Sequence, residues 1–250
     1  MGEIGCGSWC VAGGRAATEA DALPVAEVRD AIPEIAEAIL GLPSKRPVRV
    51  GICGRSAAGK TTFGDKLAAS LTRSGRPVLR AQFDDFHPPG HALRSAAGGY
   101  TVESYYDEAY DYAGFRDLLL IPLGPGGSRC CRLALHDSYT DTPKGVEVDV
   151  PSDAIVVIDG IFILRPDLRD YWEFTIWLDV SFETMIERAA KRDVAWMPSE
   201  AAVRERYLAR WIPLHALYEE TGARACADVI IDNQDLHAPR PVALRSPPHS

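Results

Sequence analysis

A short apolar run joined directly to a glycine-rich turn constrains the fold of this chain more than any other stretch. The run is "VRVGIC" (48–53), and the turn that follows is "GRSAAGKT" (54–61). The turn fits the pattern G-x-x-x-x-G-K-[ST] without a substitution. Apolar residues at 63, 67 and 71 then fall at i, i+4 and i+8, on one face of a helix. A strand, a glycine-rich loop and a helix in this order predict a phosphate-binding loop.

Each part of the loop has a physical role toward a triphosphate. Gly54 and Gly59 permit backbone angles that other residues avoid, so successive N–H groups can converge on phosphate oxygens. The following helix points its positive end at the same place. Lys60 is expected to reach the β- and γ-phosphates, and the Thr61 hydroxyl to ligate Mg²⁺. The residues predicted to bind ATP are Gly54, Arg55, Ser56, Ala57, Ala58, Gly59, Lys60, Thr61 and Thr62.

The rest of the chain alternates predicted strands with predicted helices. Apolar, β-branched runs at 76–83, 154–159, 173–179 and 227–232 indicate strands, and helical spacing indicates helices around 182–189 and at 200–219. Alternation of this kind predicts an α/β fold, a doubly wound parallel sheet with helices on both faces.

The two ends of the chain differ in composition from this central part. Residues 1–22 are rich in Gly, Ala and small polar residues and are predicted to be disordered. Apolar residues at 28, 32, 35, 39 and 40 predict an amphipathic helix, so 23–45 is interpreted as a helix appended to the domain, with use by a binding partner as the alternative. We therefore expect a nucleotide-binding domain at 46–236 and a disordered Pro-rich tail at 237–250.

Composition excludes several classes of function. The formal charge of −8 argues against binding to nucleic acid or to an anionic membrane surface. No segment has the roughly 20 apolar residues that span a bilayer, and the N-terminus lacks the layout of a signal peptide. A cytoplasmic location is the expectation. The six cysteines and six histidines are scattered without metal-ligand spacing, so no structural metal is expected.

Carboxylates follow two of the predicted strands and complete a candidate site. Asp159 ends the most apolar run of the chain and is expected to lie beside the phosphate loop, where it would coordinate Mg²⁺; the alternative is a residue that caps a turn. Asp84 and Asp85 follow the strand at 76–83. In a small-molecule kinase a carboxylate here can take the proton of the acceptor hydroxyl. Asp84, the first residue beyond the strand, is the predicted base, and one of the pair could instead cap a helix.

Two other classes of phosphate-loop protein do not fit. The only asparagine of the chain is Asn233, so the Asn/Thr-Lys-x-Asp motif with which GTPases read guanine is not present in its usual form. No segment resembles the "LSGGQ" signature of transport ATPases.

Six blocks of the sequence, in order, resemble the uridine kinase family. They span about Val48 to Asn233 and read "VGICGRSAAGKTT", "FDDFH", "SYYDEAYDY", "SDAIVVIDGIFIL", "LRDYWEFTIWLDVSFETMIERAAKRD" and "ADVIID". The resemblance implies a P-loop nucleoside triphosphate hydrolase/kinase fold with a small helical lid, here around 186–212. It also implies phosphorylation of the 5′-hydroxyl of a nucleoside with ATP and Mg²⁺. Phosphoribulokinase and pantothenate kinase are related, so the acceptor stays open.

The resemblance also assigns roles by position. The family's catalytic aspartate falls on Asp84, its acidic residue after the apolar strand on Asp159, and its lid arginines on Arg188 and Arg192. The catalytic residues expected are therefore Lys60, Asp84, Arg188 and Arg192. For the two arginines, a solvated helix face is the alternative.

The chain departs from the family at the acceptor side. The segment "VAWMPS" (194–199) lacks the usual further arginines, and a glutamine that helps the family read the pyrimidine aligns with Arg206. The family's acceptor-side tyrosine and histidine align loosely with His136 and Asp141. An arginine in an acceptor pocket suggests a more anionic or otherwise different substrate. The candidate acceptor-binding residues are Asp85, His87, Tyr106, Asp107, His136 and Arg206.

Two functions follow from the sequence. The first is an ATP- and Mg²⁺-dependent kinase that phosphorylates a hydroxyl of a nucleoside-like small molecule. The second is a nucleotide-binding regulatory or scaffold protein with little turnover. No nucleic-acid or membrane partner is expected. The sequence does not determine whether the protein forms a homo-oligomer or whether it prefers ATP or GTP.

Overall fold

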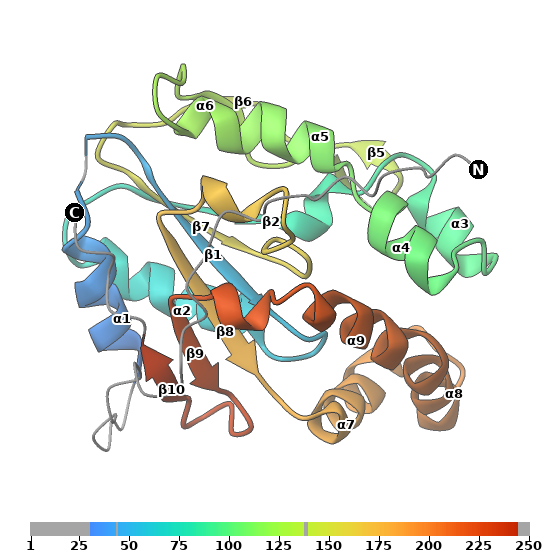
Figure 1. Cartoon of the computed structure of the whole chain (residues 1–250). Helices are drawn as coiled ribbons and strands as arrows, with labels where there is room; N and C mark the ends of the chain where they lie inside the picture. The colour runs from blue at the N-terminus through green and yellow to red at the C-terminus, as the bar shows by residue number, and fades with distance from the viewer. Residues whose placement is uncertain (1–30, 44, 138–139, 245–250) are drawn as a thin grey trace, which may run out of the picture.

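A six-stranded sheet forms the centre of the protein (Figure 1). The computed structural model describes residues 31–43, 45–137 and 140–244. The strand order is β10-β9-β8-β1-β7-β2, with β10 antiparallel to β9 and the other neighbours parallel. The strands are β1 (Val48–Gly54), β2 (Val78–Gln82), β7 (Ile155–Asp159), β8 (Phe174–Asp179), β9 (Val229–Asp232) and β10 (Arg240–Leu244).

Helices cover both faces of this sheet (Figure 1). They are α1 (Ala31–Leu40), α2 (Lys60–Thr72), α3 (His91–Ala96), α4 (Val102–Glu108), α5 (Tyr112–Phe115), α6 (Ile121–Leu123), α7 (Phe182–Asp193), α8 (Glu200–Arg206) and α9 (Ile212–Glu220). Short 3₁₀ turns lie at η2 (Phe83–Phe86), η4 (Arg169–Tyr171) and η6 (Arg224–Cys226). Two small antiparallel pairs, which the sequence did not predict, join β3 (Cys130–Arg132) to β6 (Glu147–Asp149) and β4 (His136–Asp137) to β5 (Thr142–Pro143).

The alternation of side chains along the strands divides the core into two layers. Val48, Val50 and Ile52 of β1 pack in one cluster with the apolar faces of α1, α2 and α7. Cys53 and the alternate residues of β7 pack in the other cluster, with the aromatic side chains of the segment 83–123 and with α9. Because both faces are covered, β1 and β7 are buried throughout, as continuous apolar runs in a parallel sheet require.

Two helical segments contain a π-helical turn before an Ile-Pro pair. The turns are η3 (Arg116–Leu120), before Pro122, and η5 (Tyr207–Trp211), before Pro213. Proline has no N–H to donate to the preceding turn, so the regular hydrogen-bond ladder is interrupted at that point. The segment 200–219, predicted as one helix, is therefore α8, a π turn and α9.

The predicted α/β fold with a parallel sheet is confirmed. All four further strands are found within one or two residues of the predicted bounds, and α1 (Ala31–Leu40) lies within the range 23–45 that was predicted as an appended helix. Residues 1–22 lie outside the described residues. The prediction of a disordered tail from 237 is wrong for Arg240–Leu244, which hydrogen-bonds to β9 as an edge strand. No helix in the described ranges is both long and apolar enough to cross a membrane.

Candidate functional site

The glycine-rich loop lies where β1 ends and α2 begins, with the backbone its sequence predicts. Gly54 has φ 144° and Gly59 has φ 88°, both in the region that favours glycine. A side chain at Gly54 would meet the carbonyl of Leu178, and one at Gly59 would lie 2.7 Å from Leu236 Cδ2. The loop therefore lies against the end of β8 and against the segment that follows β9, and α2 begins directly after it.

Lys60 is folded back over this loop. Its Nζ donates to the carbonyls of Gly54 at 3.2 Å and Arg55 at 2.9 Å. Burial lowers the pKa of Lys60, and the charges of Cys53, Asp84 and Asp159 partly offset that shift. The charges of the two carboxylates predicted for catalysis and for metal binding thus favour the protonated form of the loop lysine.

Thr61 and Asp159 are brought together as predicted. The Thr61 hydroxyl donates to Asp159 Oδ2 at 2.8 Å. The other carboxylate oxygen, Oδ1, accepts from Arg80 at 2.6 Å. Burial raises the pKa of Asp159, and the Arg80 guanidinium opposes the shift. A hydroxyl and a carboxylate side by side are hard oxygen donors that fit Mg²⁺ when the phosphates supply the remaining ligands.

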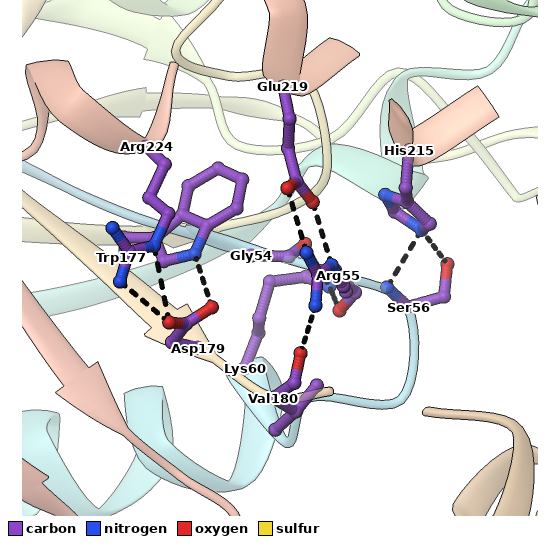
Figure 2. Close-up of polar contacts among 10 residues, drawn as sticks. All are labelled: Gly54, Arg55, Ser56, Lys60, Trp177, Asp179, Val180, His215, Glu219 and Arg224. Atoms are coloured by element: carbon purple, nitrogen blue, oxygen red, sulfur yellow. Dashed lines mark hydrogen bonds and ion pairs between the residues drawn. The ribbon is translucent and has the colours of Figure 1, made fainter. Parts of the chain in front are cut away.

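Two side chains of α9 hold the first half of the loop (Figure 2). Arg55 forms a two-point ion pair with Glu219 at 2.7 and 2.8 Å, donates to the carbonyl of Val180, and lies 4.0 Å over the ring of Phe182. His215 Nε2 accepts the N–H of Ser56 at 3.0 Å and lies 3.0 Å from its hydroxyl. Burial lowers the pKa of His215 to about 3, so the ring is a neutral acceptor.

Asp84 lies in the 3₁₀ turn that follows β2, and its side chain is exposed. Its Oδ1 accepts the hydroxyl of Tyr110 at 3.0 Å. Burial raises the pKa of Tyr110, so the phenol remains a donor. Within the described part of the chain Asp84 forms no ion pair, which leaves its second oxygen available to the hydroxyl of a substrate.

The neighbouring Asp85 and His87 are engaged differently. Asp85 is ion-paired with Lys144 at 2.6 Å. His87 is buried, its Nδ1 bonds the carbonyl of Ala109, and its ring stacks on Tyr110 at 4.1 Å. Of the two adjacent acids, Asp84 is the one whose carboxylate is open.

The described hydrogen bonds of the two lid arginines go to residues outside the phosphate loop, although Asn233, a partner of Arg188, donates through Nδ2 to the loop carbonyl of Ala58 at 2.6 Å. Arg188 on α7 donates to the carbonyls of Asn233 and Gln234, both at 2.8 Å. Arg192 is bonded to Asp193 at 2.6 Å and to the hydroxyl of Tyr207 at 3.2 Å. Neither contact tests the catalytic role that was predicted for these arginines.

The remaining acceptor candidates are spread over three segments. Tyr106 is covered by the guanidinium of Arg165 at 4.6 Å, and Asp107 lies 3.9 Å from the same group. His136 is buried, with Nε2 3.4 Å from Asp141. Arg206 at the end of α8 faces the Trp196 ring at 5.4 Å. His136 lies next to the turn that carries Asp84, because the N–H of the preceding Leu135 donates to the carbonyl of Asp85 at 2.9 Å. No described hydrogen bond or ion pair joins Tyr106, Asp107 or Arg206 to Asp84.

Three functional candidates were missed by sequence reasoning. His215 and Glu219 are four residues apart and so share one face of α9, a signal that could have been found. Arg80 is the charged residue of β2, which could have indicated a charged partner on the adjacent strand. Without knowing that β2 pairs with β7, however, that partner could not be named.

The sheet, the loop and the Thr61–Asp159 pair define the class: an α/β protein of the P-loop kinase fold. The family model described as "Phosphoribulokinase / Uridine kinase family" matches residues 49–210 of this chain. The chain belongs to this family, and the family resemblance of the sequence is confirmed.

Named relatives are similar to parts of this chain. The "Uridine kinase" of Limosilactobacillus reuteri (strain DSM 20016) is 27% identical over 75% of this chain and 84% of its own length. The "Uridine-cytidine kinase A" of Dictyostelium discoideum is 28% identical over 60% of this chain, but the match spans only 29% of that longer protein.

Solved structures share the fold at lower identity. A Bacillus stearothermophilus protein described as a "Possible Uridine Kinase" superposes with a TM-score of 0.61 at 23% identity, covering 80% of this chain and 96% of that one. D-glycerate 3-kinase from Cryptococcus neoformans gives 0.52 at 14% identity, covering 76% and 87%. The fold is thus common to proteins named for different acceptors.

Proposed function

We propose that the protein is an ATP- and Mg²⁺-dependent kinase that transfers the γ-phosphate to a hydroxyl group of a nucleoside-like metabolite. The observation that carries this proposal is the hydrogen bond of 2.8 Å between Thr61 and Asp159, next to the loop lysine at the carboxyl ends of β1 and β7. Relatives named uridine kinase support the same reaction class.

The loop side chains would stabilise charge during transfer. The N–H groups of residues 54–61 would hold the phosphates, and Lys60 would exchange its two backbone carbonyls for phosphate oxygens. Thr61 and Asp159 would hold Mg²⁺, which neutralises charge on the phosphate oxygens when bound.

Asp84 would act as the base. Its free carboxylate oxygen would accept the proton of the acceptor hydroxyl as the acceptor oxygen forms its bond to the γ-phosphorus. The bond between that phosphorus and the oxygen bridging to the β-phosphate breaks, and ADP leaves with the electron pair. Tyr110 would hold the other oxygen of Asp84 and so fix the direction of the carboxylate.

The test of this function is Asp84→Asn. We expect phosphoryl transfer to fall by about 10²–10⁴-fold, the usual contribution of a general base, while ATP binding is retained. Phosphoryl transfer is measured as acceptor-dependent ADP formation, over a panel of nucleosides, sugars and their carboxylate or phosphate derivatives. ATP binding is measured by titration calorimetry. Asp153→Asn is the control, because Asp153 is exposed just before the start of β7, at the opposite edge of the sheet, and its substitution should change the rate far less.

A second function is favoured by the engagement of Arg188 and Arg192 with other groups of the protein. A nucleotide-binding regulatory or scaffold protein would bind ATP without acceptor-dependent turnover. ADP formation that no acceptor stimulates, together with normal ATP binding, would favour it over the kinase.

A further inference from the structure

Arg80 is connected to the phosphate loop by two hydrogen bonds in series. It donates to Asp159, and Asp159 accepts from the hydroxyl of Thr61 in the loop. Arg80 projects from β2, and β2 pairs with β7 so that Arg80 lies opposite Val157 and Gln82 opposite Asp159. Its three guanidinium nitrogens are all used: Nη2 donates to Asp159 at 2.6 Å, Nη1 to the carbonyl of Val157 at 2.8 Å, and Nε to Asp65 at 3.1 Å.

Asp159 is held between two donors as a result. Its side chain is only 5% exposed, and its two oxygens are divided between the Arg80 guanidinium and the Thr61 hydroxyl. Planar guanidinium donors fix the orientation of a carboxylate more strictly than a lysine does. With Oδ1 fixed by Arg80, Oδ2 is the oxygen that faces the loop.

Gly64 on α2 makes room for this arrangement. A Cβ at this position would lie 2.6 Å from Arg80 Nη2 and 2.8 Å from its Cζ. The guanidinium therefore lies directly against the backbone of the helix that begins with the loop lysine. Since Arg80 is held at three nitrogens, it could not yield to a methyl group without losing contacts.

We propose that Arg80 is a positioning residue for the metal-side carboxylate: it fixes Asp159 so that Oδ2, beside Thr61, is presented to the Mg²⁺ of the bound nucleotide. The proposal rests on the proposed function in one respect, namely that Asp159 binds Mg²⁺. Arg80 itself touches neither nucleotide nor metal in this scheme.

The test compares metal binding in variants that disturb Arg80 in two ways. Arg80→Met removes the guanidinium, whereas Gly64→Ala keeps every charge and displaces the guanidinium; alanine also favours a helix more than glycine does. Mn²⁺ bound in the presence of a non-hydrolysable ATP analogue is measured by the loss of its free electron-paramagnetic-resonance signal. Affinity for the analogue alone is measured in EDTA.

We expect both variants to weaken Mn²⁺ binding by about 10-fold or more, as loss of a ligand-orienting contact typically does. Affinity for the metal-free analogue should not change. Arg73→Met, which removes an exposed positive charge at the end of α2, is the control and should match the unmodified protein. If Arg80→Met does not fold, as judged by circular dichroism, Gly64→Ala carries the test.

A double-mutant cycle separates positioning from a general effect of charge. If Arg80 acts through Asp159, Arg80→Met should have no further effect on Mn²⁺ binding in an Asp159→Asn background. Additive effects, unchanged binding in both single variants, or tighter binding in Arg80→Met would each overturn the proposal. A protein that binds Mn²⁺ with the analogue but phosphorylates no acceptor would overturn the proposed function and leave this one intact. A protein that does not bind the analogue would overturn both.

Discussion

The phosphate loop follows a buried strand, whereas Arg192 and Trp196 of the lid lie at the surface. Arg55 of the loop and its partner Glu219 expose 14% and 22% of their side chains, and Asp159 only 5%. In the lid, Arg192 exposes 59% of its side chain and Trp196 is 61% exposed. The groups that would hold the donor phosphates are thus preorganised by distant parts of the chain.

Of the arginines in the lid, Arg188 donates to the distant carbonyls of Asn233 and Gln234, whereas Arg192 and Arg206 obtain their partners nearby. Arg192 bonds Asp193, its neighbour on α7, and Arg206 faces a ring on the adjoining segment. Contacts of this kind can be exchanged for others at little cost, because exposed ion pairs contribute little to stability. We expect substitutions in the loop to affect function and stability more than substitutions in the lid. Four experiments test this expected difference.

Lys60→Met should have the largest effect. Removing a positioned cation that stabilises transition-state charge should lower the rate of phosphoryl transfer by roughly 10²–10³-fold. The initial rate of ADP release with the best acceptor from the panel measures it. Lys191→Met, which removes an exposed lysine of α7, is the control. Equal losses in the two variants would contradict the special position of the loop.

Glu219→Gln should destabilise the fold next most strongly. It leaves Arg55, which is mostly buried, without its carboxylate, and we expect a loss of about 1–3 kcal/mol in the free energy of unfolding. Urea denaturation measures the change. Glu108→Gln removes the partner of Arg94 in a pair that is 43% and 53% exposed, and it should cost less than about 1 kcal/mol.

His215 should make stability depend on pH. Its pKa is about 3 in the folded protein and near 6.5 when exposed, so the unfolded chain binds a proton first as the pH falls. The stabilisation is complete above about pH 6.5 and is lost toward pH 3, with a slope of at most about 1.4 kcal/mol per pH unit. His215→Gln can still accept from Ser56, and it should flatten the profile between pH 6.5 and 4. An unchanged slope would contradict this assignment, and exposed His237→Gln is the control.

Trp196→Leu should have the smallest effect. It removes a ring that Arg206 faces at 5.4 Å on an exposed surface, and we expect a loss below about 0.5 kcal/mol in the free energy of unfolding. Phe182→Leu removes the ring under Arg55 at 4.0 Å and should cost more. A larger loss at Trp196 than at Phe182 would mean that the lid is more tightly packed than its exposure indicates.

Much of the donor side could be predicted from the sequence. The loop at 54–61 is one continuous motif, and its backbone angles depend on glycines at fixed spacing. Asp159 and Asp84 could be placed because each ends a predicted strand, and parallel strands end at one edge. The prediction that Thr61 and Asp159 lie together needed no further information.

The acceptor side could be predicted only as a list of residues. His136 lies on a two-residue strand, and Tyr106 is covered by an arginine about 60 positions further along the chain. Such contacts depend on loops whose paths carry no periodic signal. The edge strand β10 was missed for a related reason: the Pro-rich composition of the tail suggested a loop, although an edge strand tolerates a proline such as Pro241.

By itself, the sequence determined the class of the protein, because the phosphate loop, its flanking strand and its helix are local and contiguous. Tertiary structure decided which charges face which: Arg80 reaches Asp159 only because β2 lies beside β7, and Glu219 reaches Arg55 only because α9 packs across the end of β1. The physical reason is the distance along the chain between the residues that interact. Backbone geometry is set by neighbours in sequence, whereas the orientation of a buried charge is set by whichever opposite charge the fold brings within hydrogen-bond distance.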